Sequence, residues 1–145
     1  MDFFSSMNVS SSALTAGRTR MNLISSNLAN ANATRTPEGG PYKRKDAVFA
    51  ATPVENRFSR TLDGATAQQI RKVEVAEIVE DLNPPRLQYD PSHPDANPQG
   101  YVAMPNVNVV EEMADMIGAT RAYEANVTAV QAAKSMAMKT LEIGR

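Results

Sequence analysis

Apolar residues recur with heptad spacing at both ends of the chain, and this spacing is absent from the middle. Near the N-terminus, one row runs at intervals of seven from Met7 through Leu14 and Met21 to Leu28, beside a row that includes Gly17 and Ile24. Near the C-terminus, steps of four and three join Val109, Met113, Met116, Thr120, Tyr123, Val127, Val130, Lys134, Ala137 and Leu141. Such a stripe keeps one face of a helix against a partner. We therefore predict two terminal helices, over about 3–31 and 109–143, that pack through these residues.

Proline separates these helices from a middle region of another kind. All nine prolines lie between Pro37 and Pro105, and proline inside a helix removes a backbone donor and clashes with the preceding turn. In the middle, residues 72–80 alternate valine with charged residues, which indicates a half-buried strand, and residues 46–54 contain a short extended stretch. Residues 84–105 hold six of the prolines. There we expect ordered loop or extended chain and no packed sheet core.

These patterns predict an α+β fold, with two long terminal helices in an antiparallel, coiled-coil-like pair and a small, proline-rich, β-containing middle region. The helical domain would comprise residues 1–33 and 107–145, and the β-rich or extended insertion residues 34–106. Because residues 31 and 109 flank the insertion, partner numbers should sum to about 140, which places Gly17 opposite Tyr123. Asn108 with Glu111 resembles a capping box at the start of the second helix.

Composition removes most catalytic classes. Fifteen basic and sixteen acidic residues give a net charge of −1, which argues against a general binder of nucleic acid or of membrane surfaces. With no cysteine and one histidine, the chain has no disulfide and no thiolate chemistry. No apolar run approaches the about 20 residues of a membrane span, and we expect no cleavable signal peptide. We predict a protein that is not an enzyme and that uses no cofactor, metal, small-molecule substrate or nucleic acid.

Two segments raise a question of site chemistry. His93 and Asp95 could supply two ligands to a metal ion, but one histidine with a few carboxylates does not make a usual closed site, so a hydrogen bond that locks the loop is favoured. Gly39 and Gly40 precede a basic run, but the proline that follows them argues against a phosphate cradle. Either this is a turn that presents a basic strip, or the basic residues contact an acidic neighbour.

The composition of the helices favours assembly over an isolated helix pair. Fourteen of the 28 residues from 5 to 32 are serine, asparagine or threonine, which are mediocre helix formers. Isolated helices draw most of their stability from tertiary burial, so we expect neighbouring subunits to order them, as in the wall of a helical tube. Lys134 is the one charged residue in the C-terminal row. We expect it to pair with an acidic group of a neighbouring subunit, because an unpaired buried ammonium is costly.

Four separated motifs resemble those of the bacterial flagellar rod and hook family of axial proteins. The terminal motifs are SALTAGRTRMNLISSNLAN at 12–30 and RAYEAN at 121–126, with LEIGR at the end. The middle motifs, TPEGGPYKR at 36–44 and a stretch over 89–108, are most similar to the short proximal-rod subunits. The motif residues are Asn27, Asn30, Gly39, Gly40, Pro41, Tyr42, His93, Asp95, Gly100, Tyr101, Pro105, Asn106, Arg121, Glu124 and Asn126.

The resemblance implies a structural subunit of the flagellar basal body that serves motility. Such subunits are exported unfolded by the flagellar type III export apparatus, without a cleaved signal peptide, and they assemble in the periplasm into a drive shaft around the export channel. The implied partners are copies of the same chain, neighbouring proximal and distal rod subunits, and the adaptor at the rod base. The alternatives are a free-standing coiled-coil adaptor and another short rod subunit such as rod protein B, which the Gly-Gly-Pro-Tyr and His-Pro-Asp motifs disfavour.

Overall fold

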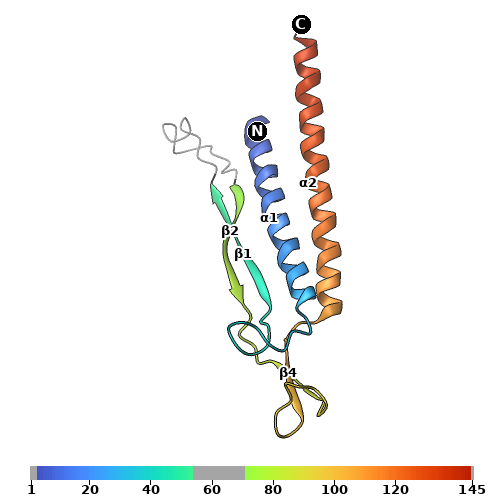
Figure 1. The fold of residues 1–145 in the computed structure, drawn as a ribbon. Coiled ribbons are helices and arrows are strands. Elements are labelled where there is room, and N and C mark those ends of the chain that lie inside the picture. The colour runs from blue at the N-terminus through green and yellow to red at the C-terminus, as the bar shows by residue number, and fades with distance from the viewer. Residues whose placement is uncertain (1–2, 54–70, 145) are drawn as a thin grey trace.

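Two long helices lie side by side in the computed structural model, which describes residues 3–53 and 71–144, and a β-hairpin runs along the first helix (Figure 1). The elements are α1 (Phe3–Ala29), β1 (Lys45–Pro53), β2 (Arg71–Glu80), β3 (Arg86–Tyr89), β4 (Tyr101–Met104) and α2 (Val109–Ile143). The start of α1 and the end of α2 lie toward one end of the molecule, and β4 lies near the other. The predicted α+β fold with a terminal helix pair is confirmed.

The helices are antiparallel and have the predicted register. A Cβ atom built on Gly17 would lie 3.6 Å from Cδ2 of Tyr123. The Thr120 hydroxyl lies 3.9 Å from the sulfur of Met21. In both pairs the residue numbers sum to about 140, as expected from the position of the insertion. The Tyr123 ring therefore lies against Gly17 at a distance that leaves room for a methyl group.

The face that α2 turns toward α1 is shifted by about one residue from part of the predicted row. Met116 and Tyr123 are half-buried, but Glu112 and Ala119 are buried where their neighbours Met113 and Thr120 are exposed. The small side chain of Ala119 permits the close approach of the two helices. The buried Glu112 carboxylate contacts Asn27 of α1 and Arg44. Neither Glu112 nor Ala119 is a large apolar residue, so the spacing of large apolar residues does not reveal this shift.

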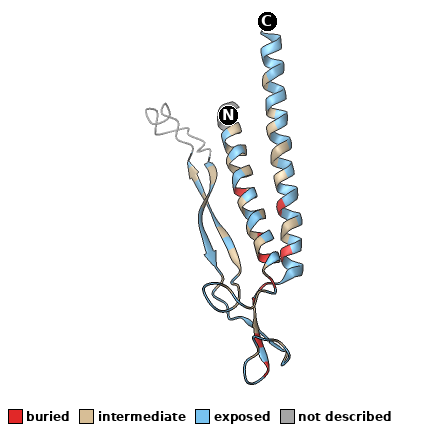
Figure 2. Ribbon diagram, viewed as in Figure 1, coloured by how far each residue is buried: buried red, intermediate tan, exposed pale blue. Residues whose placement is uncertain are grey.

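A second face of α1 packs against the hairpin. Ser12, Ala16 and Thr19 line a groove together with Val73 and its neighbours on β2. The backbone N–H of Val73 donates to the Ser12 hydroxyl over 3.1 Å. This face is made of small and hydroxyl side chains, which is why the spacing of large apolar residues did not predict it. Buried residues of α1 and α2 lie mainly in the half of the pair nearer the connecting loops (Figure 2).

The first hairpin confirms both predicted strands within the described residues. β1 and β2 pair antiparallel from Lys45 opposite Glu80 to Pro53 opposite Arg71. The register shifts between Val48 and Phe49, and such a bulge bends a strand and increases its twist. Residue 54 and the segment 55–70, to which no motif was assigned, lie outside the described residues.

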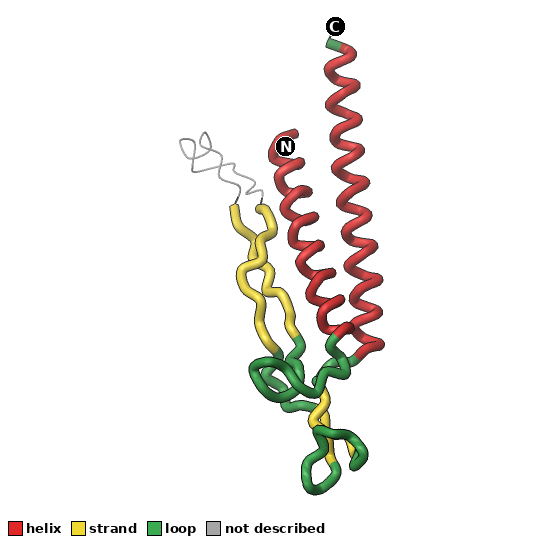
Figure 3. The backbone as a smooth tube through the Cα atoms, viewed as in Figure 1, coloured by secondary structure: helices red, strands yellow, loops and turns green. Residues whose placement is uncertain are grey.

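The proline-rich stretch forms a second hairpin whose pairing was not predicted (Figure 3). β3 and β4 pair antiparallel, and the rings of Tyr89 and Tyr101 meet edge to face with centroids 5.3 Å apart. The prolines of this region precede, separate or follow the two strands, so none removes a donor from the ladder. The expectation of ordered loop or extended chain without a packed sheet core is confirmed, because the strands are short and β3 is exposed throughout; only their pairing was not expected.

We expect Gly17→Leu to lower the free energy of unfolding by about 1–3 kcal/mol, because the added atoms would overpack the Tyr123 ring. Gly17→Ala is the matched control, since its methyl group would meet the ring at an ordinary contact distance and alanine favours a helix. Thermal unfolding followed by far-ultraviolet circular dichroism, at one chain concentration, measures both. Equal melting temperatures for the wild-type and leucine chains would contradict this register.

Candidate functional site

The side chain of Asn27 lies where α1, β1 and α2 meet, and it is 1% exposed. Its Nδ2 donates to the carbonyl oxygen of Lys45 over 2.9 Å and to Oε2 of Glu112 over 3.2 Å. Its Oδ1 accepts from the Lys45 N–H and from the Tyr42 hydroxyl, each over 3.0 Å. The amide thus uses both of its donors and accepts two hydrogen bonds. Its burial therefore leaves no polar atom without a partner.

Glu112 is the second buried polar group, and it is also 1% exposed. Its Oε1 accepts from Nε of Arg44 over 2.6 Å, and Arg44 also contacts Oδ2 of Asp46 over 3.2 Å. Burial lowers the pKa of Arg44, but the hydrogen bonds to Glu112 and Asp46 outweigh it and leave the pKa above its ordinary value. The guanidinium stays charged and compensates the buried carboxylate, which would otherwise be strongly destabilising.

Asn27, Tyr42, Arg44 and Glu112 form one connected group, which we call the polar node. Its hydrogen bonds join side chains that are 15, 68 and 85 positions apart in the sequence. The Tyr42 hydroxyl also lies 3.3 Å from the Ser26 hydroxyl. The node therefore fixes how the chain leaves α1, enters β1 and begins α2.

A helix cap at the start of α2 and a glycine turn before Tyr42 bring the side chains of the node together. Asn108 caps α2 by accepting from the N–H of Val110 over 3.2 Å, which places Glu112 in the first turns of the helix. Gly39 and Gly40 have φ angles of +88° and +81°, which glycine adopts readily, and the turn they form precedes Tyr42 and Arg44. The predicted turn is confirmed.

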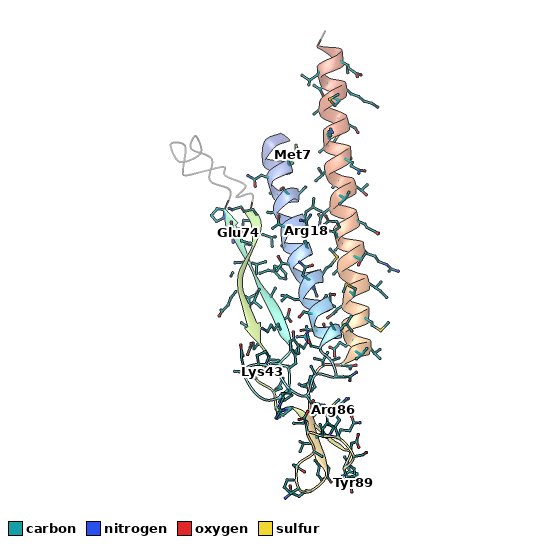
Figure 4. All side chains as sticks on the ribbon, viewed as in Figure 1. Met7, Arg18, Lys43, Glu74, Arg86 and Tyr89 are labelled. Carbon is teal, nitrogen blue, oxygen red and sulfur yellow. The ribbon has the colours of Figure 1, made fainter. Side chains whose placement is uncertain are left out.

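The basic residues after this turn pair with carboxylates of the same chain. Besides the contacts of Arg44, Lys43 and Lys45 lie 3.6 and 3.5 Å from the carboxylate of Glu80 on β2. Figure 4 shows Lys43 at the base of the hairpin, away from Glu74 at its other end. These two ion pairs are exposed and contribute little to stability each. Their effect is to keep the basic strip against the hairpin.

The loop around His93 is locked by hydrogen bonds, as predicted. The N–H of Asp95 donates to Nδ1 of His93 over 3.1 Å, and the Asp95 carboxylate accepts from the Thr34 hydroxyl over 2.9 Å. Hydrogen bonds from the hydroxyl and N–H of Ser92 lower the pKa of Asp90. Gly100 closes the loop with a φ of +82°, and a Cβ there would lie 2.9 Å from the Tyr89 ring.

The other predicted site residues are spread over the molecule. The residues of the two rows that are buried or half-buried are Met7, Leu14, Gly17, Met21, Ile24, Leu28, Met116, Tyr123, Val127, Val130 and Ala137. The exposed ones are Val109, Met113, Thr120, Lys134 and Leu141. Among the motif residues outside the node and loop, Pro105 is buried, Asn30, Pro41 and Asn126 are half-buried, and Tyr101, Asn106, Arg121 and Glu124 are exposed. Their roles in assembly stay predictions.

Sequence reasoning missed the importance of Glu112 and Arg44. In the sequence, Glu112 lies outside the apolar row, and Arg44 is one residue of a basic run. A weak signal was available, because Glu112 begins a row at intervals of seven that continues with the small residues Ala119, Asn126 and Ala133, beside the apolar row. Within residues 3–53 and 71–144, no group of three potential metal ligands occurs and no helix is long and apolar enough to cross a membrane.

Comparisons with known proteins agree with the motifs. Residues 7–35 match the family described as flagella basal body rod protein, and residues 99–143 match the C-terminal region of the flagellar basal body rod FlgEFG proteins. The flagellar basal-body rod protein FlgC of Borreliella burgdorferi is 47% identical over 99% of this chain and 98% of its own length. FlgC of Bacillus subtilis is 46% identical over the full length of both chains, and FlgC of Salmonella typhimurium 40% over 94% of each. The chain belongs to the FlgC family.

Membership of the FlgC family makes the chain a structural subunit of the flagellar basal-body rod, a family without catalytic activity. The polar node bridges the two regions of family similarity, because Asn27 lies in the first and Glu112 in the second. Tyr42 and Arg44 come from the segment between them. The polar node is thus a joint within a FlgC subunit. Its side chains form hydrogen bonds and an ion pair with one another.

We expect Glu112→Gln to lower the free energy of unfolding by about 1–3 kcal/mol, because it leaves the Arg44 charge without its closest partner. Glu111→Gln is the matched control: it removes the same charge one residue earlier, from an exposed side chain, and should stay within about 0.5 kcal/mol of wild type. Thermal unfolding by circular dichroism compares the two. If both variants lose the same stability, the effect comes from the helix dipole and not from the node.

Proposed function

We propose that this chain is a subunit of the proximal part of the flagellar rod and polymerises with other rod proteins around the export channel. Similarity to FlgC proteins over nearly the whole chain carries this proposal. The proposal adds position, neighbours and route to the structural role that the family establishes.

The surface of α2 supports assembly with neighbours. Val110, Met113 and Ile117 follow one another at steps of three and four, so they share one face of α2, and each is more than half exposed. Proteins that work as monomers rarely expose contiguous apolar patches of this kind, and such patches mark interaction sites. Neighbouring subunits would cover them in a rod.

The proposed partners are further copies of the chain, adjacent proximal and distal rod subunits, and the adaptor at the rod base. The proposed route is export in an unfolded state by the flagellar type III export apparatus, followed by folding in the periplasm. A helix rich in serine, asparagine and threonine suits this route, because it gains most of its order from tertiary contacts. The polar node would form only after export, since its members come from distant parts of the chain.

A gene replacement tests the proposal. Deletion of the gene from its flagellated host should abolish swimming, and the wild-type chain should restore swimming and appear in purified basal bodies at the proximal end of the rod. Swimming that persists without the chain, or a restored strain whose basal bodies lack it, would favour the coiled-coil adaptor.

We expect Lys134→Glu to reduce swimming in soft agar, because the predicted partner of Lys134 is an acidic group of a neighbouring subunit and reversal of charge turns attraction into repulsion. Lys134→Arg keeps the charge and should swim better than the glutamate variant. Exposed in the single chain, Lys134 can be changed without disturbing its fold. Wild-type swimming in both variants would remove the ion-pair hypothesis.

A further inference from the structure

The strand β3 has an open edge on the side away from β4. The N–H of Asp90 donates to the carbonyl oxygen of Gly100 over 2.9 Å. The adjacent pair in the ladder, Tyr89 with Tyr101, is therefore a non-hydrogen-bonded pair, because the two kinds of pair alternate along antiparallel strands. Tyr89, and Leu87 two residues before it, consequently direct their N–H and C=O groups outward. Within the described residues, no other segment forms hydrogen bonds with these four groups.

The corresponding edge of β4 is covered where Tyr101 faces outward. The N–H of Asn97 donates to the carbonyl oxygen of Tyr101, and Oδ1 of Asn97 accepts from the Tyr101 N–H, each over 2.9 Å. Proteins often protect an exposed strand edge with charged side chains. Leu87 and Tyr89, whose backbone groups are open, are uncharged, and they are 64% and 65% exposed. Figure 4 shows Arg86 and Tyr89 on this hairpin, at the end of the molecule away from the free ends of the helices.

Proline bounds the open edge on both sides and restricts how another strand can pair with it. Pro85 and Pro91 occupy the positions where the next outward N–H groups would lie, and proline has no N–H. If the incoming strand is β3 of a second copy, one antiparallel register satisfies all four outward groups of both copies. It places Leu87 of each copy opposite Tyr89 of the other. A shift by two residues sets a proline opposite one of them and leaves a carbonyl group without a donor.

The side chains of β3 are complementary to themselves in the same register. Arg86 of each copy lies opposite Asp90 of the other, and Leu87 lies opposite Tyr89. Within the described residues Arg86 forms no ion pair. Both hydrogen bonds from Ser92 go to Oδ1 of Asp90, so they leave Oδ2 for a partner. Opposite charges and aromatic–aliphatic pairs directly across two strands stabilise a sheet.

We propose that two copies of this chain pair through their β3 strands, edge to edge and antiparallel, so that the two hairpins form one continuous sheet. The occupant of the open edge is a second copy, because the register that satisfies the backbone also brings each arginine to an aspartate. Both copies use the same surface, so the contact has two-fold symmetry and closes at two chains.

The dimer is a state of chains outside a rod. Copies in a helical polymer all point the same way, whereas a two-fold axis sets the two chains in opposite directions. The dimer must therefore open before either chain is incorporated. The inference does not rest on the rod assignment, which the gene replacement above tests separately.

A single cysteine tests the register. Because the chain has no cysteine, Gln88→Cys adds one thiol next to the two-fold axis, where the Cα atoms of the two copies would lie about 4.5 Å apart, within reach of a disulfide. Gln99→Cys, at an exposed position in the loop of the same hairpin, is the matched control. Both purified full-length chains are oxidised and run on a non-reducing gel. We expect a disulfide-linked dimer from Gln88→Cys in several-fold excess over the control, and an equal or lower yield overturns the proposal.

Sedimentation velocity of the full-length chain measures the association itself. We expect a weak monomer–dimer equilibrium, with a dissociation constant between about 1 μM and about 1 mM, because a four-residue edge makes a small interface. Leu87→Pro removes an outward N–H from each copy and none from the β3–β4 ladder, so it should raise the dissociation constant about tenfold or more. Leu87→Val keeps the N–H and is the matched control. A wild-type chain that is monomeric at about 1 mM overturns the proposal.

A change of side-chain charge gives a second measurement that leaves the backbone as it is. Arg86→Glu places a carboxylate opposite Asp90 of the other copy, and like charges directly across two strands are destabilising. We expect this exposed substitution to weaken the dimer and to leave the circular dichroism spectrum unchanged. A dimer that is as strong in Leu87→Pro or in Arg86→Glu as in the wild type uses another surface and overturns the pairing through β3.

Discussion

A fully hydrogen-bonded amide holds the three parts of this chain in place. Asn27 donates to the backbone of β1 and to the carboxylate at the start of α2, and accepts from β1 and from Tyr42. Inside a protein each of these bonds is strong, and each unpaired group would be costly. The amide cannot exchange one partner without leaving others unsatisfied. It therefore specifies one arrangement of helix pair and hairpin.

The hydrogen bonds of Asn27 matter for the fold because the apolar core is small. The buried apolar side chains of the described residues are few, and three of them, Ala16, Ala31 and Ala119, are alanine. Small side chains let the helices approach closely but remove little apolar surface from water. The Arg44–Glu112 pair and Asn27 lie at the end of the helix pair near the connecting loops. Toward the chain termini, α2 presents mostly exposed residues.

This distribution of buried polar groups and exposed apolar side chains explains how such a chain can serve as a rod subunit of the FlgC family. Polar bonds define the joint within the subunit, and large apolar side chains stay outside, where neighbours can bury them. The molecule is narrow because α1 lies between α2 and the hairpin in a single row of elements (Figure 1). Its ends are formed by different elements, which gives the subunit a direction and suits growth along an axis.

Local and periodic signals in the sequence determined much of the fold. The bounds of α2 followed from the capping residue Asn108 and a proline-free stretch, β2 from its alternation, and the helix register from the position of the insertion. The tertiary structure alone decided which face α2 turns to α1, that β3 pairs with β4, that Ser12 anchors the hairpin, and that Glu112 meets Arg44. Those contacts join distant polar or small residues, whose pairing leaves no period in the sequence. Periodicity shows which residues can share a face, and only packing shows what that face contacts.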